Sequence, residues 1–143
     1  MTDTVSVLEA KYAALEQLLD DIAAGSSDAC TDAVVAELAE RHERVVRRME
    51  SIGNRRILDV SDRDAFRVSG SKNLTDYMST RLRITHPRRR LRAVQHLEAM
   101  HAMTGELLPP RAPNTAAGLA DGGLGADHVD AILDVLALSL IHI

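Results

Sequence analysis

Six arginines lie in one short stretch in the middle of the chain. They are the residues of this chain that are best suited to binding an anion. They are Arg81, Arg83, Arg88, Arg89, Arg90 and Arg92, and they flank the segment Ile84-Thr85-His86-Pro87. A guanidinium group is planar, permanently charged and able to bind a phosphate or a carboxylate through two N–H groups. The stretch therefore predicts either contacts to a polyanion, such as duplex DNA, or ion pairs with acids elsewhere in the chain.

The distribution of charge leaves both interpretations open. Residues 1–40 contain nine acids and one base, residues 41–92 fifteen bases and six acids, and residues 93–143 six acids and one base. The chain as a whole has a net charge of −4. A basic middle segment can place one local basic surface against a nucleic acid. The same arginines can instead neutralise the acidic residues of the first helix.

Other residues that carry chemistry do not form a recognisable set. Cys30 is the only cysteine, so a disulfide framework and a cysteine-rich zinc site are excluded. His96 and His101 are five residues apart, so they do not lie on one helix face as metal-binding histidines at i and i+4 do. The six histidines are His42, His86, His96, His101, His128 and His142. We expect no cofactor, no metal site and no enzymatic activity in this chain.

Two long helices open the predicted fold. Apolar residues recur at spacings of 3, 4, 3, 4 and 3 in both, which is a heptad seam. In the helix expected from about residue 4 to 24 the seam is Val5, Leu8, Tyr12, Leu15, Leu19 and Ile22. In the helix expected from about residue 28 to 65 it is Val35, Leu38, His42, Val45, Met49 and Ile52. Either the seams pair as an antiparallel hairpin, with Leu15 and Val45 in its core, or they pair between chains in a homodimer.

Two features of the second helix have simple expectations. Gly53-Asn54 interrupts the apolar pattern and either ends the helix or weakens it. The arginines off the seam are expected to form a solvated face. They are Arg41, Arg44, Arg47, Arg48, Arg55 and Arg56.

The arginine-rich stretch itself predicts a helix-turn-helix-like pair. A helix is expected over about 73–83, and Thr85 is expected to cap a second helix with Pro87 in its first turn. Leu91, Val94, Leu97 and Met100 would form the buried stripe of that second helix. Positive charge at a helix start opposes the helix dipole. A phosphate backbone, or acids from residues 1–40, would relieve that conflict.

The remainder of the chain predicts shorter helices. An extended linker is expected over 107–113, a short helix over 114–120 and a last helix from about 126, with loops at 67–72 and 122–125. The predicted fold class is therefore all-α: a long antiparallel helical hairpin, a helix-turn-helix-like pair and shorter helices. The predicted divisions are residues 1–66, 67–135 and an atypical tail at 136–143. With no signal peptide and no membrane-spanning apolar run in the sequence, we expect a cytoplasmic location and no membrane partner.

Residues after about 67 resemble a known family. The most specific match starts with Thr104-Gly105-Glu106 and Leu108-Pro109-Pro110. It continues through Pro113, Thr115-Ala116-Ala117, Gly123, Gly125-Ala126, His128-Val129 and Ile132. The segment Leu82-Arg83-Ile84-Thr85-His86 also resembles the family's turn. This order and spacing is similar to the helical N-terminal domain of the actinobacterial 13E12-repeat family, whose members often carry a C-terminal HNH endonuclease module.

The resemblance implies a DNA-associated helical module in front of a nuclease. The chain departs from the family at Arg88-Arg89, where many relatives have a Glu-Ala pair. It also lacks the metal-holding and general-base histidines of an HNH site, so we expect a truncated and inactive form. The ending Ser-Leu-Ile-His-Ile is similar to translated sequencing-adapter read-through. The predicted function is a non-catalytic DNA-associated module, with a protein-interaction or dimerisation module as the alternative.

Overall fold

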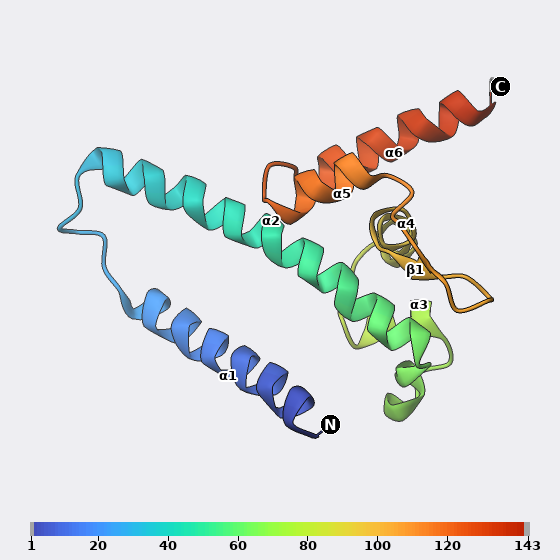
Figure 1. Cartoon of the computed structure of the whole chain (residues 1–143). Helices are drawn as coiled ribbons and strands as arrows, with labels where there is room; N and C mark the ends of the chain where they lie inside the picture. The colour runs from blue at the N-terminus through green and yellow to red at the C-terminus, as the bar shows by residue number, and fades with distance from the viewer. Residues whose placement is uncertain (1, 142–143) are drawn as a thin grey trace. The chain divides into compact units, whose positions relative to one another are not determined.

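The fold is all-α apart from one small antiparallel ladder, as the sequence predicts (Figure 1). It is known from a computed structural model that describes the backbone of residues 2–141 and the side chains of residues 7–139. The chain divides into two compact units, residues 1–39 and residues 40–143.

The first unit contains α1 (Thr2–Ala24) and the start of α2 (Asp32–Asp62). The helix α1 ends at a turn in which Gly25 N donates to Ile22 O over 3.1 Å. Thr31 caps α2, because its Oγ1 accepts a hydrogen bond from Val34 N over 3.3 Å. The bounds of both helices agree with the heptad pattern to within a few residues.

The apolar seams of both helices are largely exposed within the single chain. On α1, Leu19 and Ile22 are exposed, while Leu15 is half-buried. On α2, Val45 is 48% exposed, although the seam predicts it in a core. That Leu15 and Val45 both lie in the core of a hairpin stays a prediction. Heptad spacing identifies an apolar face, but it does not say what covers that face.

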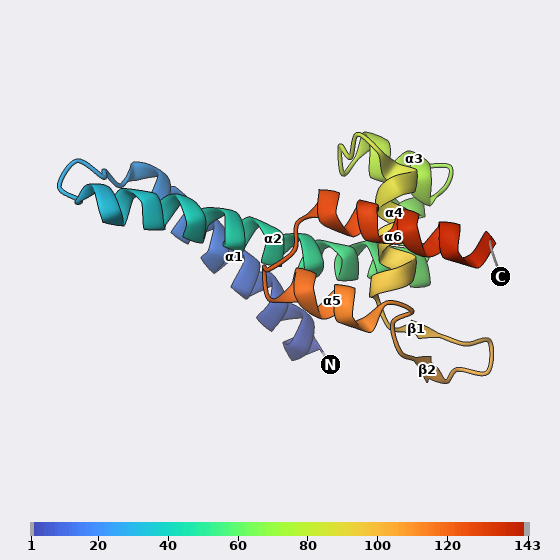
Figure 2. The same cartoon turned by 90° about the horizontal axis from the view of Figure 1, so that it is seen from above.

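The second unit is built around α4 (Pro87–Leu97). Besides α4 and the later part of α2, it contains the 3-10 helix η1 (Ala65–Ser69), α3 (Leu74–Thr80), β1 (Met100–His101), β2 (Leu107–Leu108), α5 (Pro113–Ala120) and α6 (Ala126–Ile141). Viewed from above, α4 lies among α3, α5 and α6 (Figure 2).

Two apolar clusters meet on α4 and form the core of this unit. The first joins α2, α3 and α4 through Ile57, Leu58, Met78 and Val94. The second joins α4, α5 and α6 through Ala93, Leu97, Ala112, Leu119, Val129 and Leu133. Adjacent residues Ala93 and Val94 thus face different clusters, so α4 is buried from two sides. A helix in that position is a core element of the unit.

The turn between α3 and α4 is built differently from the expected one. Asn73 caps α3, since its Oδ1 accepts from Asp76 N over 2.8 Å. The residue before α4 is His86, not Thr85, and its side chain makes no capping hydrogen bond. Arg83 has a left-handed backbone, with φ at 56°, where a glycine is usual. An arginine therefore adopts the conformation that the absent turn glycine would have supplied.

The chain after α4 also differs from the sequence expectation. The helix ends at Leu97, and Glu98 has an extended backbone, with φ −103° and ψ 146°. Met100 consequently does not extend the helical stripe. It pairs with Leu108 in a short antiparallel hairpin, whose turn is made by Gly105 at a φ of 88°. The expected linker over 107–113 is thus partly a strand.

The C-terminal part matches the expected helices closely. Gly122, at a φ of 84°, makes the turn between α5 and α6. Residues 136–139 and the backbone of 140–141 continue α6, whereas residues 142–143 of the atypical tail lie outside the described residues. No helix among the described residues is both long and apolar enough to cross a bilayer.

A pH-dependent contribution to stability follows from Glu98 at the end of α4. Burial raises the pKa of Glu98; the nearby Arg55 lowers it and Asp59 raises it. A carboxyl group whose pKa is raised on folding stabilises the fold below the ordinary glutamate pKa. That contribution is lost as the pH rises through the higher value of the folded state. The negative charge also lies at a helix C-terminus, which the dipole disfavours.

We therefore expect Glu98→Gln to raise the free energy of unfolding at pH 7 and to leave it little changed at pH 4. The measurement is denaturant unfolding of both proteins across this range. Two stability curves that run parallel from pH 4 to pH 8 would contradict the assignment.

Candidate functional site

The six arginines of the predicted site fall into two groups in the structure. Arg89, Arg90 and Arg92 form ion pairs with acids of α2 and α6, within the second unit. Arg81, Arg83 and Arg88 are exposed, and none of them forms an ion pair among the described residues. The structure therefore brings only half of the predicted set together. DNA contact by these arginines stays a prediction.

Arg90 joins α4 to α2 through three polar contacts. Its Nη1 lies 3.1 Å from Glu50 Oε1, its Nη2 donates to Glu50 O over 3.2 Å, and its Nε donates to Asn54 Oδ1 over 2.5 Å. Asn54 is only 1% exposed, so its amide oxygen depends on this donor. Burial lowers the pKa of Arg90, while the charge of Glu50 raises it. We call this group of residues the Arg90 clamp.

The clamp explains why a glycine stands inside α2. A Cβ atom added at Gly53 would lie 2.7 Å from Arg90 Nη2. A side chain at this position would therefore force the guanidinium group, which is held by Asn54 and Glu50, to shift. The pair Gly53-Asn54, which the sequence marks as an end or weak point of the helix, is instead where α4 docks on a continuous α2.

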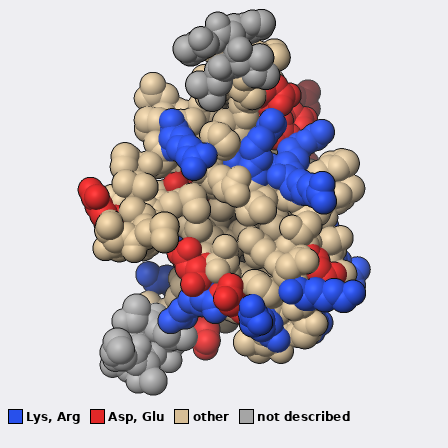
Figure 3. Space-filling model, turned by 90° about the vertical axis from the view of Figure 1, so that its right-hand side faces the viewer, with Lys and Arg blue, Asp and Glu red and all other residues tan. Residues whose placement is uncertain are grey.

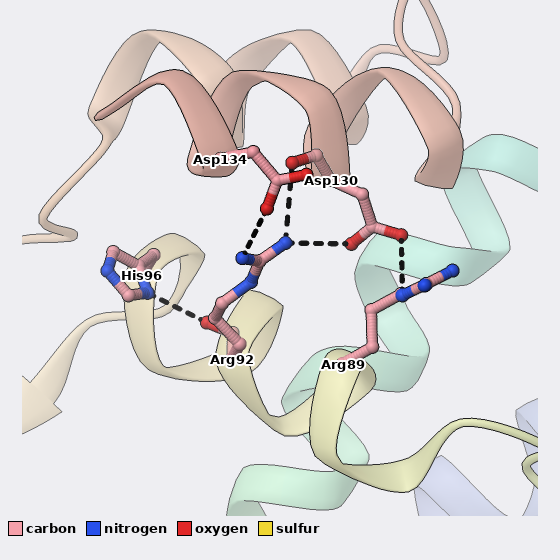
Figure 4. Close-up of polar contacts among 5 residues, drawn as sticks. All are labelled: Arg89, Arg92, His96, Asp130 and Asp134. Atoms are coloured by element: carbon pink, nitrogen blue, oxygen red, sulfur yellow. Dashed lines mark hydrogen bonds and ion pairs between the residues drawn. The ribbon is translucent and has the colours of Figure 1, made fainter. Parts of the chain in front are cut away.

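Arg89 and Arg92 join α4 to α6 on its other side (Figure 4). Arg92 Nη1 donates to Asp134 Oδ1 over 2.7 Å, and its Nη2 lies 3.6 Å from Asp130 Oδ1. Arg89 Nε lies 3.5 Å from Asp130 Oδ2. The acids are four residues apart on α6 and the arginines three apart on α4, so each pair lies on one helix face. Together with Arg90, Arg89 is therefore paired from within the unit, whereas Arg88 in the same first turn of α4 forms no ion pair with a described residue.

One arginine of the expected solvated face of α2 also has a structural role. Arg47 Nε donates to Gly122 O over 2.5 Å, at the turn between α5 and α6. Gly122 is buried, and an added Cβ would lie 2.5 Å from Arg44 Cγ. The prediction of a purely solvated face is wrong at Arg47. That residue satisfies a carbonyl of a glycine turn that packs directly on α2.

The packing of α4 limits the face that it could present to DNA as a recognition helix. Such a helix lays one face in the major groove of DNA. On α4 the apolar residues Ala93, Val94 and Leu97 are buried, and Arg90 and Arg92 are committed to ion pairs. The exposed side chains that remain are those of Arg88, Arg89 and Gln95. On the face shown in Figure 3, basic and acidic side chains are interspersed and do not form one continuous basic surface.

Sequence reasoning missed the acidic partners of these arginines. Asp130 and Asp134 had a usable signal, because their i, i+4 spacing places them on one face of a predicted helix, as the i, i+3 spacing does for Arg89 and Arg92 on another. Glu50 and Asn54 also share a helix face at this spacing. Nothing in the sequence indicates, however, that either pair faces α4, since the partners lie 36 to 42 residues from their arginines.

A cleft lies in the second unit beside the start of α4, with a volume of about 230 Å³. Its apolar lining includes Ile84, Ala93, Leu119 and Val129, and its charged lining includes Glu50, Arg89, Arg90, Asp127 and Asp130. Among the described residues, no three His, Cys, Asp or Glu side chains gather closely enough to hold a metal ion. The cleft therefore offers an apolar floor with charged groups of both signs.

Comparisons with known proteins add no assignment. No protein-family model matches the chain, and no curated protein or solved structure matches it significantly. The resemblance to the 13E12-repeat family thus stays a prediction that rests on the motifs quoted above.

The Arg90 clamp makes a testable prediction about Gly53. Alanine is better than glycine inside a helix by about 1 kcal/mol. In the wild type that gain is opposed, because the new Cβ disturbs Arg90. We expect Gly53→Ala to be neutral or destabilising in the wild type but to stabilise the Arg90→Ala variant by about 1 kcal/mol. Chemical denaturation of the four proteins of this double-mutant cycle measures the difference.

A matched control separates the clamp from general helix propensity. Ser51 lies on α2 but off the helix face shared by residues 50, 53, 54 and 57. Ser51→Ala should change stability equally in both backgrounds. Equal effects of Gly53→Ala in the two backgrounds would contradict the clamp.

Proposed function

We propose that the chain is a protein-interaction module that associates, through its heptad helices, with a second copy of itself. The supporting observation is the exposed apolar seam of α2, on which Val35, Leu38, Val45 and Ile52 are 44%, 44%, 48% and 44% exposed. From Val35 to Ile52 this seam spans about 26 Å at 1.5 Å per residue. An apolar face of that length is typical of interaction surfaces.

A second copy is favoured as the partner by pattern and by charge. Both α1 and α2 have the same 3, 4, 3, 4, 3 spacing, which knobs-into-holes packing between like helices requires. The range of α1 holds five acids and one base, whereas residues 41–56 hold six bases and two acids. The heptad helices of two copies therefore attract one another electrostatically. Pairing of the seams within one chain is the rival arrangement, and it predicts a monomer.

The dimer is tested by the double change Leu38→Gln with Val45→Gln. Wild-type protein should sediment as a dimer at micromolar concentration. The variant should dimerise about a thousandfold more weakly or not at all, because four apolar contacts are lost in the dimer, two from each copy, and each contributes about 1 kcal/mol. Its helix content should be unchanged, since both side chains are exposed in the single chain. Sedimentation equilibrium and circular dichroism are the measurements.

A matched control changes two exposed apolar side chains outside the seam. Val68→Gln with Leu107→Gln should leave the dimerisation constant unchanged, because neither residue lies on a heptad helix. A wild-type protein that is monomeric up to millimolar concentration would contradict the proposal. It would favour pairing of the seams within one chain.

Association with DNA is a second candidate, supported by the arginines that the fold leaves exposed. Arg81, Arg83 and Arg88 surround the turn between α3 and α4. Arg88 and Arg89 also line a surface hollow together with Thr75 and Thr85, whose hydroxyl groups can donate to phosphate oxygens. In this proposal the turn contacts the phosphate backbone without a helix entering the major groove, and the module has no catalysis of its own.

For DNA association, the informative variant is Arg81→Glu with Arg88→Glu. It spares the ion pairs of Arg89, Arg90 and Arg92, so the fold should survive. Affinity for duplex DNA should fall by at least tenfold. The slope of the logarithm of affinity against the logarithm of salt concentration should become shallower by the amount expected for the loss of about two phosphate contacts. Titrations at two or more salt concentrations measure both. Wild-type protein that binds no duplex at low salt would exclude this candidate.

A further inference from the structure

The cleft beside α4 has two charged side chains, Arg89 and Asp127, that the fold leaves partly or wholly without partners. Arg90 and Glu50 satisfy each other there, and Asp130 is engaged by Arg89 and Arg92. Arg89 binds Asp130 through Nε alone, and Figure 4 shows its two terminal nitrogens directed away from that carboxylate. Asp127 has no hydrogen bond or ion pair with any described residue. The two terminal nitrogens of Arg89 and the carboxylate of Asp127 are therefore available to a ligand in the cleft.

The apolar part of the cleft limits what can accompany those charges. Ile84, Ala93, Leu119 and Val129 supply an aliphatic floor, with Leu119 and Val129 almost fully buried at 2% and 1% exposed. The volume of about 230 Å³ is below the range typical of drug-sized ligands. An occupant must therefore be a small molecule with one compact aliphatic group.

We propose that this cleft binds a small aliphatic α-amino acid in its zwitterionic form. The carboxylate of the ligand pairs with the terminal nitrogens of Arg89, which are suited to bidentate contacts. Its ammonium group pairs with Asp127, and its side chain lies on the aliphatic floor. A zwitterion gives both Arg89 and Asp127 a partner of opposite charge. A simple anion would be repelled by Asp127, and a simple cation would be repelled by Arg89. The site is separate from the seam of the proposed dimer, since none of the seam residues Val35, Leu38, Val45 and Ile52 lines the cleft.

The test uses three ligands that share one carbon skeleton. L-leucine carries both charges, 4-methylpentanoate lacks the ammonium group and 3-methylbutylamine lacks the carboxylate. Isothermal titration of the full chain should show saturable 1:1 binding of L-leucine and at least tenfold weaker binding of the other two. Saturable binding of the amine or the acid alone, as tight as that of L-leucine, would overturn the zwitterion assignment. Absence of any saturable binding of L-leucine would overturn the site.

Variants locate the binding within the chain. Arg89→Gln and Asp127→Asn remove one charge each from exposed side chains, and each should weaken L-leucine binding by at least tenfold. Arg88→Gln is the matched control on the same helix turn and should change the affinity by less than twofold. Because Arg89 also pairs with Asp130, circular dichroism melting of each variant checks that the fold is retained. Equal affinities of all three variants and the wild type would place the ligand elsewhere.

Discussion

The second unit depends on one interaction, the insertion of Arg90 between Glu50 and Asn54. A half-buried guanidinium group is tolerated only if its N–H groups find acceptors, and α2 supplies a carboxylate, a carbonyl and an amide oxygen. This requirement dictates the local sequence of α2. Gly53 provides the space, Asn54 provides a buried acceptor, and both stand in a helix interior that otherwise disfavours them.

The clamp also explains how a helix with a basic first turn can occupy the middle of a core. The dipole of α4 opposes positive charge at its start, but acids from α2 and α6 approach that charge from two sides. Arg47 provides a similar connection from α2 to the turn at Gly122. In a chain with 2% aromatic residues, arginines thus connect helices that larger apolar side chains would otherwise join.

Local features of the fold were predictable from the sequence, and pairings over long distances were not. Heptad spacing, the Pro87 start and the Gly122 turn were sufficient to locate α1, α2, α4 and α6, whereas the 3-10 helix η1 begins before, and overlaps, the loop expected over 67–72. The end of α4 was placed too late, because Met100 fits the helical stripe but pairs instead with Leu108 across a turn. The arginines of the candidate site were found from composition alone. Their partners Glu50, Asn54 and Asp130 could not be chosen, since many acids lie at suitable spacings and only the tertiary fold selects among them.

The exchange of the Arg90 Nε proton with water tests most directly whether the arginine-rich stretch belongs to the core. Nuclear magnetic resonance of ¹⁵N-labelled arginine side chains resolves each Nε–H group. The clamp predicts that the Arg90 Nε proton exchanges at least tenfold more slowly than that of Arg88, and that Asn54→Ala abolishes the difference. Equal and fast exchange at Arg90 and Arg88 would contradict this account, because it would place both guanidinium groups in water.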